Sequence, residues 1–83
     1  MAEKSELQTL AGVVRSARRE RGLSQDEMVR RSGLSLSAIR KIEAGQTPNP
    51  GVFTVLRLWE SLGLPLSQLE ALDMPAQDFN GLD

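Results

Sequence analysis

The chain has 83 residues, 40% of them hydrophobic and 25% charged, with a net charge of −1 and neither cysteine nor histidine, which excludes disulfides and thiolate chemistry. No apolar run approaches the roughly 20 residues of a membrane span, and the polar N-terminus MAEKSELQ lacks the apolar segment of a signal peptide. We therefore expect one small cytoplasmic domain with no cofactor, metal site or membrane partner.

The first expected element is an amphipathic helix over residues 7–21, preceded by a flexible segment, residues 1–8, in which a first helical turn can begin. Its apolar side chains recur every three or four residues and form one stripe: Leu7, Leu10, Val14 and Ala17. Gly22 is expected to end the helix, with Leu23 packing behind it. The outer face carries Arg15, Arg19 and Arg21.

The next stretch, QDEMVRRSGLSLSAIRKIEAG, predicts two short helices separated by a tight turn. Ser24 and Glu27 have the spacing of a capping box at the start of the first helix. Gly33 can end that helix in a left-handed conformation, and Ser35 can cap the second. The second helix begins at Leu36 and ends at Gly45, with Ile39 and Ile42 facing inward. Two helices joined by a short glycine-containing turn indicate a helix-turn-helix.

The rest of the chain predicts one longer and one short helix. Residues 46–51 read as a loop, with Asn49 as the N-cap and Pro50 as the first residue of a helix that continues to about Leu62. A short helix then starts at Leu64–Pro65. The tail, residues 73–83, is acidic and shows no periodicity, so we expect it to be disordered or a docking segment. No strand pattern occurs, and the expected fold class is all-α with five helices.

The spacing within the motif resembles the Xre/Cro-type, lambda-repressor-like family of DNA-binding proteins. Counted from Gln25, Val29 is fifth, Gly33 ninth, Ile39 fifteenth and Ile42 eighteenth. The resemblance runs from about Leu10 to Leu69 and implies a compact five-helix domain over residues 9–72. The chain departs from the family at its fifth position, where alanine is usual and Val29 could push the two helices slightly apart.

Two further departures concern the core. Ala17 stands where the family usually has a larger aliphatic residue, and Trp59 where it usually has alanine. Because cores conserve total volume more strictly than individual residues, we hypothesise that Trp59 fills the space left by Ala17. A buried indole would need a partner for its N–H group.

The exposed face of the second motif helix is expected to read bases. Its residues are Leu36, Ser37, Arg40 and Lys41. Lys41 can donate to guanine O6 and N7, and Ser37 can serve several bases. Leu36 leaves two alternatives open, an apolar contact with a thymine methyl group or packing on a neighbouring helix. Arg40 could hold a base or a phosphate. Because bidentate readers are few, DNA shape would supply part of the specificity.

Phosphate contacts are expected at helix starts and in the loop after the second motif helix. The candidates are Gln25, Ser35, Thr47 and Asn49. Gln25 has the support of the resemblance, although it could also be only a good helix former, and Asn49 could serve only as an N-cap. The resemblance further implies a partly buried ion pair between Arg18 and Glu43, so we interpret Arg18 as structural.

Charge and apolar residues divide the chain into two halves. The half through Gln46 carries nine basic and six acidic residues, whereas the half from Thr47 carries one basic and five acidic residues. This division fits a domain whose basic half faces DNA and whose acidic half faces away from it. Ordinary surface charges in contact with solvent would also explain it. Because one small reader binds DNA weakly, we expect a homodimer. The expected interface is an apolar cluster that could alternatively close the core: Leu64, Leu66, Leu69, Leu72 and Met74.

The main functional hypothesis is therefore a sequence-specific regulator of transcription, a repressor or autoregulator, that binds double-stranded DNA as a dimer. The alternative is a protein-interaction module on the same scaffold, such as an antitoxin, whose acidic C-terminal half binds a partner protein. An enzyme is not expected, since histidine and cysteine are absent and no carboxylate pair occupies an evident cleft.

Overall fold

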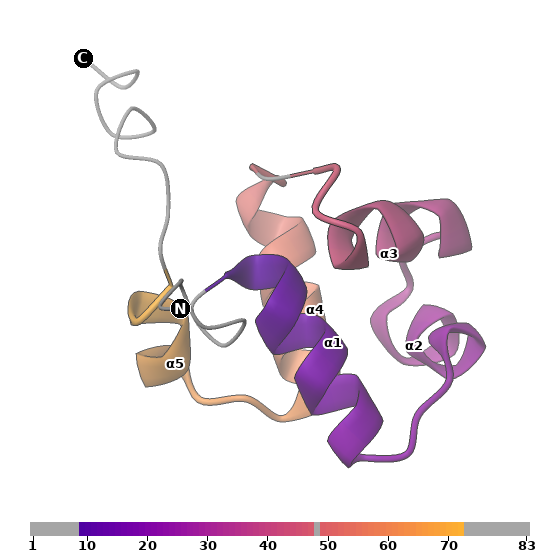
Figure 1. The fold of residues 1–83 in the computed structure, drawn as a ribbon. Coiled ribbons are helices and arrows are strands. Elements are labelled where there is room, and N and C mark those ends of the chain that lie inside the picture. The colour runs from indigo at the N-terminus through magenta and orange to yellow at the C-terminus, as the bar shows by residue number, and fades with distance from the viewer. Residues whose placement is uncertain (1–8, 48, 73–83) are drawn as a thin grey trace, which may run out of the picture.

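The computed structural model describes residues 9–47 and 49–72, which form five α-helices and no strand (Figure 1). The helices are α1 (Leu10–Glu20), α2 (Gln25–Ser32), α3 (Leu36–Glu43), α4 (Val52–Leu62) and α5 (Leu66–Glu70). Both α1 and α2 pack against α3 and α4. The expected all-α fold is confirmed, whereas the predictions for residues 1–8 and 73–83 fall outside the described residues.

Side-chain caps fix where the first three helices begin. The Thr9 hydroxyl accepts a hydrogen bond from the Gly12 amide at 3.0 Å, so α1 starts at Leu10. Ser24 and Glu27 form the predicted capping box of α2, and the Ser35 hydroxyl accepts from the Ala38 amide at the start of α3. These caps act within three residues, which explains why a sequence pattern can reveal them.

Gly33 makes the turn between α2 and α3 possible. Its φ of 77° lies in the left-handed region, which a glycine enters without steric cost. The Ser32 hydroxyl strengthens the turn by donating to the Met28 carbonyl and accepting from the Leu34 amide. The helix-turn-helix predicted from the sequence is thus confirmed, and its second helix follows the first after only three residues.

The predicted start of α4 was wrong. Asn49 is not the N-cap and Pro50 is not helical, because Gly51 occupies the cap position and the helix begins at Val52. Gly51 is extended, with φ −63° and ψ 157°, and no side chain caps the helix. Glycine is well tolerated at an N-cap, and the Gly51 carbonyl accepts from the Val55 amide. The loop between α3 and α4 is therefore longer than expected.

The core is one apolar cluster drawn from α1 to α4 and closed by residues that follow them. Its most deeply buried side chains include Val14, Met28, Ile39, Leu58 and Trp59. Ile39, the fifteenth residue of the motif, is fully buried, and Val29, the fifth, packs against the same cluster. Because α3 inserts its apolar face into this cluster, its opposite face remains on the surface.

Trp59 is buried, as the volume hypothesis requires, with only 2% of its surface exposed. Its indole nitrogen donates to the Pro65 carbonyl at 3.1 Å, which supplies the partner that a buried N–H needs. Ala17 belongs to the same core cluster. A hollow of about 240 Å³ lies beside Ala17, but it is open to solvent and is lined also by Glu20 and Arg21, so it is a groove at the surface and not a gap within the core.

Candidate nucleic-acid interface

The outer face of α3 brings together all four predicted base-reading residues. Leu36, Ser37, Arg40 and Lys41 line an open hollow of about 390 Å³ together with Ala44 and Gln46. We call these six residues the reading surface. Ser37, Arg40 and Lys41 are exposed, and Leu36 is half-buried. The surface is thus a cationic helix face with small and apolar side chains between the charges.

Ala44 and Gln46 were not among the residues predicted from the sequence to contact DNA. Ala44 follows Arg40 by four residues and Lys41 by three, so helical spacing alone would have placed it on the same face. Gln46 lies just beyond the left-handed Gly45, where no periodicity applies. Its side chain adds a neutral amide, which can donate and accept, to a surface whose other polar groups are one hydroxyl and two cations.

Leu36 turns toward the reading surface rather than the core. The partly buried hydrophobic residues that pack on the core, among the described residues, are Val29, Leu34, Leu64 and Leu69, a set without Leu36. Its place in the hollow beside Ser37 and Lys41 favours an apolar contact outside the domain over packing on a neighbouring helix.

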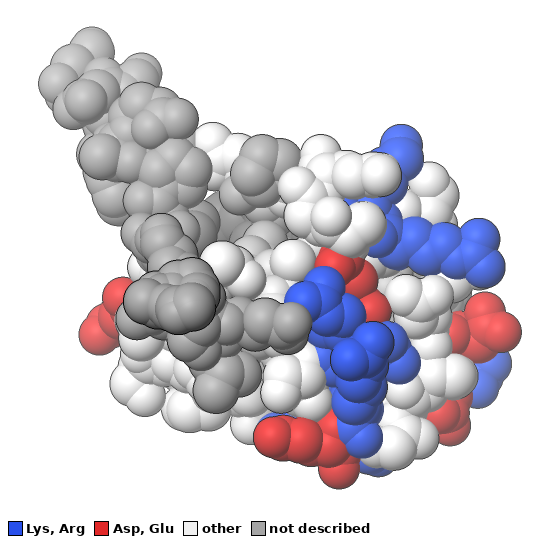
Figure 2. All heavy atoms as spheres, in the orientation of Figure 1, with Lys and Arg blue, Asp and Glu red and all other residues white. Residues whose placement is uncertain are grey.

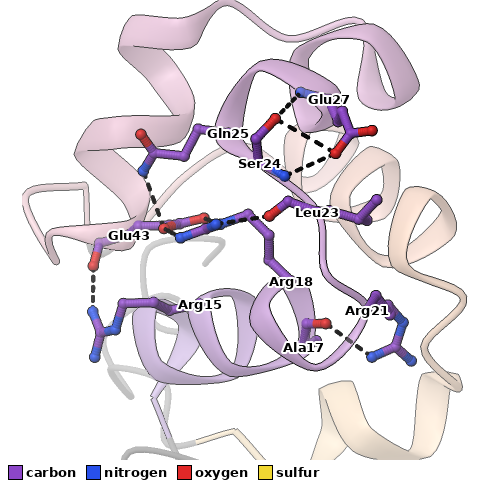
Figure 3. Close-up of polar contacts among 9 residues, drawn as sticks. All are labelled: Arg15, Ala17, Arg18, Arg21, Leu23, Ser24, Gln25, Glu27 and Glu43. Atoms are coloured by element: carbon purple, nitrogen blue, oxygen red, sulfur yellow. Dashed lines mark hydrogen bonds and ion pairs between the residues drawn. The ribbon is translucent and has the colours of Figure 1, made fainter.

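Glu43 anchors the end of α3 to α1 (Figure 3). Arg18 donates to both carboxylate oxygens, from Nε to Oε2 at 2.7 Å and from Nη2 to Oε1 at 2.9 Å. The same guanidinium donates from Nη1 to the Leu23 carbonyl at 2.9 Å. A bidentate pair of this kind is both stronger and more directional than a single hydrogen bond. The expected Arg18–Glu43 ion pair is therefore present, and it fixes α3 relative to α1 and the start of α2.

Burial makes this ion pair sensitive to the loss of either partner. The Arg18 side chain is 14% exposed and the Glu43 side chain 5%. The hydrogen bonds from Arg18 to Glu43 raise the pKa of Arg18 above its ordinary value, the negative charge of Glu43 adds to this effect, and burial opposes it. Arg18 therefore remains protonated throughout the physiological pH range.

Two further side chains converge on Glu43 (Figure 3). Gln25 Nε2 donates to Glu43 Oε1 at 3.1 Å, and Arg15 Nη1 donates to the Glu43 backbone carbonyl. Neither contact could be predicted from the sequence, because Gln25 and Glu43 are 18 residues apart and the Arg15 contact is to a backbone atom. Glu43 is thus a junction where α1, α2 and α3 meet.

Gln25 lies at the first position of α2, where the sequence predicted a phosphate contact. Its amide nitrogen has two N–H donors, and one of them points to Glu43. Because a carboxylate only accepts hydrogen bonds, this contact fixes which end of the amide is the nitrogen. The capping box uses the amides of Ser24 and Glu27, which leaves those of Gln25 and Asp26 outside the box.

The other predicted phosphate ligands flank α3 in the chain. Ser35 caps α3 and is exposed, and because its oxygen accepts a hydrogen bond, its O–H remains a donor. Thr47, half-buried, and Asn49, exposed, lie in the loop between α3 and α4. The structure therefore places one polar candidate before α3 and two after it.

Basic side chains gather over α1 and α3 in the view of Figure 2, with fewer acidic side chains between them. The net charge of −1 therefore hides a local excess of positive charge around the reading surface. Such a distribution, more than the net charge, governs attraction to a polyanion.

The apolar residues predicted to form a dimer interface separate into different environments. Leu72 is 8% exposed and part of the core, so its assignment to a free surface was wrong. Leu64 and Leu69 pack on the core, which also limits what they offer a partner. Leu66 is 62% exposed, and Met74 lies outside the described residues. Leu72, which follows α5, closes the core with support from Leu64 and Leu69, as the alternative stated for this cluster predicts, whereas α5 itself has no buried residue.

Sequence comparison assigns this architecture to a family. Residues 9–72 match the family described as "Helix-turn-helix domain", while no curated protein and no solved structure matches the chain. Within the described residues, no helix is long and apolar enough to cross a membrane. No group of three or more metal-ligating side chains comes together in that part of the chain either.

Proposed function

Since the chain belongs to the helix-turn-helix domain family, which implies a DNA-binding regulator, we propose that it is a sequence-specific repressor or autoregulator that inserts α3 into the major groove as a homodimer. The observation that carries this proposal is the reading surface. A cationic, solvent-facing helix whose opposite face is locked into the core is suited to insertion in a groove about 12 Å wide.

Each residue of the reading surface has a distinct role in this proposal. Lys41 donates to guanine, Ser37 donates to or accepts from a base edge, and Leu36 contacts a thymine methyl group. Arg40, near the end of α3, serves a phosphate or a base. Ala44 and Gln46 extend the contact toward the loop after α3. The small Ala44 side chain permits close approach, and the Gln46 amide is a neutral hydrogen-bonding group.

Phosphates would hold the helix in register from both sides. Gln25 and Ser35 donate from the starts of α2 and α3, and Thr47 and Asn49 donate from the loop after α3. Glu43 has an indirect part in this scheme, because it orients the Gln25 amide and leaves its second N–H available to a phosphate oxygen.

Loss of Lys41 should reduce specificity. We expect Lys41→Ala to lower the discrimination at one base pair by about 1–3 kcal/mol. The measurement selects preferred sites from a randomised duplex library and then compares them by fluorescence anisotropy over a salt series. Arg30→Ala is the matched control, because it removes one exposed positive charge from α2, outside the reading surface. The absence of any duplex binding by the wild type at low salt would refute the proposed function.

Loss of Gln25 should have a different signature. We expect Gln25→Met, which keeps the length of the side chain but removes its donors, to weaken binding by a similar factor on all sequences, because phosphate contacts carry no base information. The slope of log affinity against log salt should stay unchanged, since the lost donor is neutral. Gln68→Met on α5 serves as the control. A changed sequence preference in Gln25→Met would contradict the assigned role.

A second candidate function is a protein-interaction module, such as an antitoxin, that binds a partner through its C-terminal half. Exposed apolar side chains in that half, including Phe53 and Leu66, favour it. The same anisotropy series separates the two functions: an interaction module that has lost DNA binding would show no salt-dependent association with duplex DNA, and the C-terminal half would then serve as bait for a partner.

A further inference from the structure

The first turns of α4 carry apolar side chains that the fold does not cover. Val52 is 64% exposed, Phe53 77% and Leu56 39%. Phe53 and Leu56 are three residues apart and Val52 and Leu56 four, so the three side chains are neighbours on one side of the helix. We call them the α4 patch. Single exposed hydrophobic residues are ordinary, but contiguous ones mark contact surfaces.

The core does not need these residues. The buried face of α4 consists of Val55, Leu58, Trp59 and Leu62, so the helix is apolar on two sides at its start. A surface helix normally shows one apolar stripe with a polar face opposite. The second apolar side of α4 therefore indicates a surface that another molecule covers.

The charge pattern identifies the chemistry of that molecule. From Ala44 to Leu56 the sequence AGQTPNPGVFTVL holds no charged residue. The patch itself is therefore uncharged. One helical turn further along α4 lie Arg57, whose guanidinium donates to the Ser32 carbonyl at 3.4 Å, and Glu60, so the rim of the patch carries one charge of each sign. Because the three patch residues are neutral, two copies can bring them together without like-charge repulsion, which a two-fold interface requires since each side chain near the axis approaches its own copy.

The α4 patch lies close in the chain to the end of the reading helix α3. Residues 44–51 lead directly from the end of α3 to the patch (Figure 1), so a two-fold axis through the patch lies close to both α3 helices. A two-fold dimer on DNA needs its two reading helices about 34 Å apart, the spacing of successive major grooves on one face of the duplex. An interface that adjoins the loop after α3 would fix the position of each α3 helix relative to its copy.

We propose that the α4 patch is the surface through which two copies of this chain associate, with Phe53 at the centre of the contact. This inference rests on the proposed function for its biological purpose. It places the interface on α4 and not on the apolar cluster around α5, where the sequence predicted it. α5 offers less, because Leu66 is its one large hydrophobic residue among the described exposed ones.

The first test measures mass by sedimentation equilibrium over a concentration series of the full chain. The wild type should shift from 9.1 kDa toward twice that mass. We expect Phe53→Ser to weaken association at least about tenfold, as for a central interface residue, while the unfolding temperature extrapolated to low protein concentration stays unchanged because Phe53 lies outside the core. Leu66→Ser, a comparably exposed residue on α5, should associate like the wild type.

Three results would overturn the proposal. They are a wild type that stays monomeric at the highest concentration, a Phe53→Ser variant that associates normally, and a Leu66→Ser variant that alone becomes monomeric. Unfolding of Phe53→Ser would not obscure the test, because Val52→Ser and Leu56→Ser should each weaken association in the same direction.

A second measurement separates this inference from the proposed function. On a mixed-sequence 30-base-pair duplex, Phe53→Ser should bind with a shallower salt slope than the wild type, since each binding unit then contacts fewer phosphates. Association without any DNA binding would support the interface and refute the regulator. Conversely, a Phe53→Ser variant that associates normally but binds the duplex more weakly would show that the patch contacts DNA, and would overturn the proposed interface.

Discussion

Glu43→Gln is expected to destabilise the domain by about 3–5 kcal/mol, the cost of leaving a buried charge without its partner. Arg18 would keep its positive charge at 14% exposure and lose the carboxylate that it contacts through two nitrogens. A domain of this size has a total stability of about 4–12 kcal/mol. The variant should therefore unfold at a temperature lower by at least about 12 °C, measured by circular dichroism with urea titrations alongside.

The matched control is the exposed ion pair of α1. Glu20 and Arg21 approach to 3.8 Å with side-chain exposures of 73% and 38%, so Glu20→Gln removes the same charge and should change stability little. The double variant Arg18→Met with Glu43→Met should cost less than Glu43→Gln alone, because no buried charge is left unpaired. Equal losses from the two carboxylate variants, or a double variant worse than the single, would contradict the role assigned to the pair.

Trp59→Ala is the second change expected to have a large effect, at about 3–5 kcal/mol. It removes the largest of the fully buried side chains in the described structure and leaves a cavity between α4 and its neighbours. It also removes the hydrogen bond to the Pro65 carbonyl, which ties the end of α4 to the segment that leads into α5. Thermal and urea unfolding followed by circular dichroism would measure the loss without relying on the fluorescence of the missing indole.

The same variant tests the volume hypothesis. If Trp59 occupies space that a larger residue at position 17 would fill, Ala17→Leu should restore part of the stability of Trp59→Ala. In the wild-type background, Ala17→Leu should cost about 1–3 kcal/mol by overpacking, less if the hollow beside Ala17 accepts the added atoms. Trp59→Phe is the control that keeps most of the ring volume. Strictly additive effects of the two substitutions would mean that the residues do not share space.

Local interactions account for what the sequence determined by itself. Ser24 and Glu27, Gly33, and Ser35 each act on residues no more than three or four positions away, so their spacing predicts where α2 ends and where α2 and α3 begin. The apolar residues at helical intervals predict which face of α3 is buried, and therefore which residues, from Leu36 to Lys41, are left outside. The fold class and most of the reading surface followed from these signals.

Contacts between distant residues decided the rest. The Gln25–Glu43 hydrogen bond and the Arg15 contact with the Glu43 backbone join residues 18 and 28 positions apart, and no pattern of residue types encodes them. Leucines at helical spacing could not show whether Leu72 closes the core or faces a partner, because burial in a core and burial in an interface both remove apolar surface from water. The exposure of Phe53 likewise depends on where α4 begins, which Gly51 fixes by its extended backbone two residues later than the proline and asparagine signals suggested.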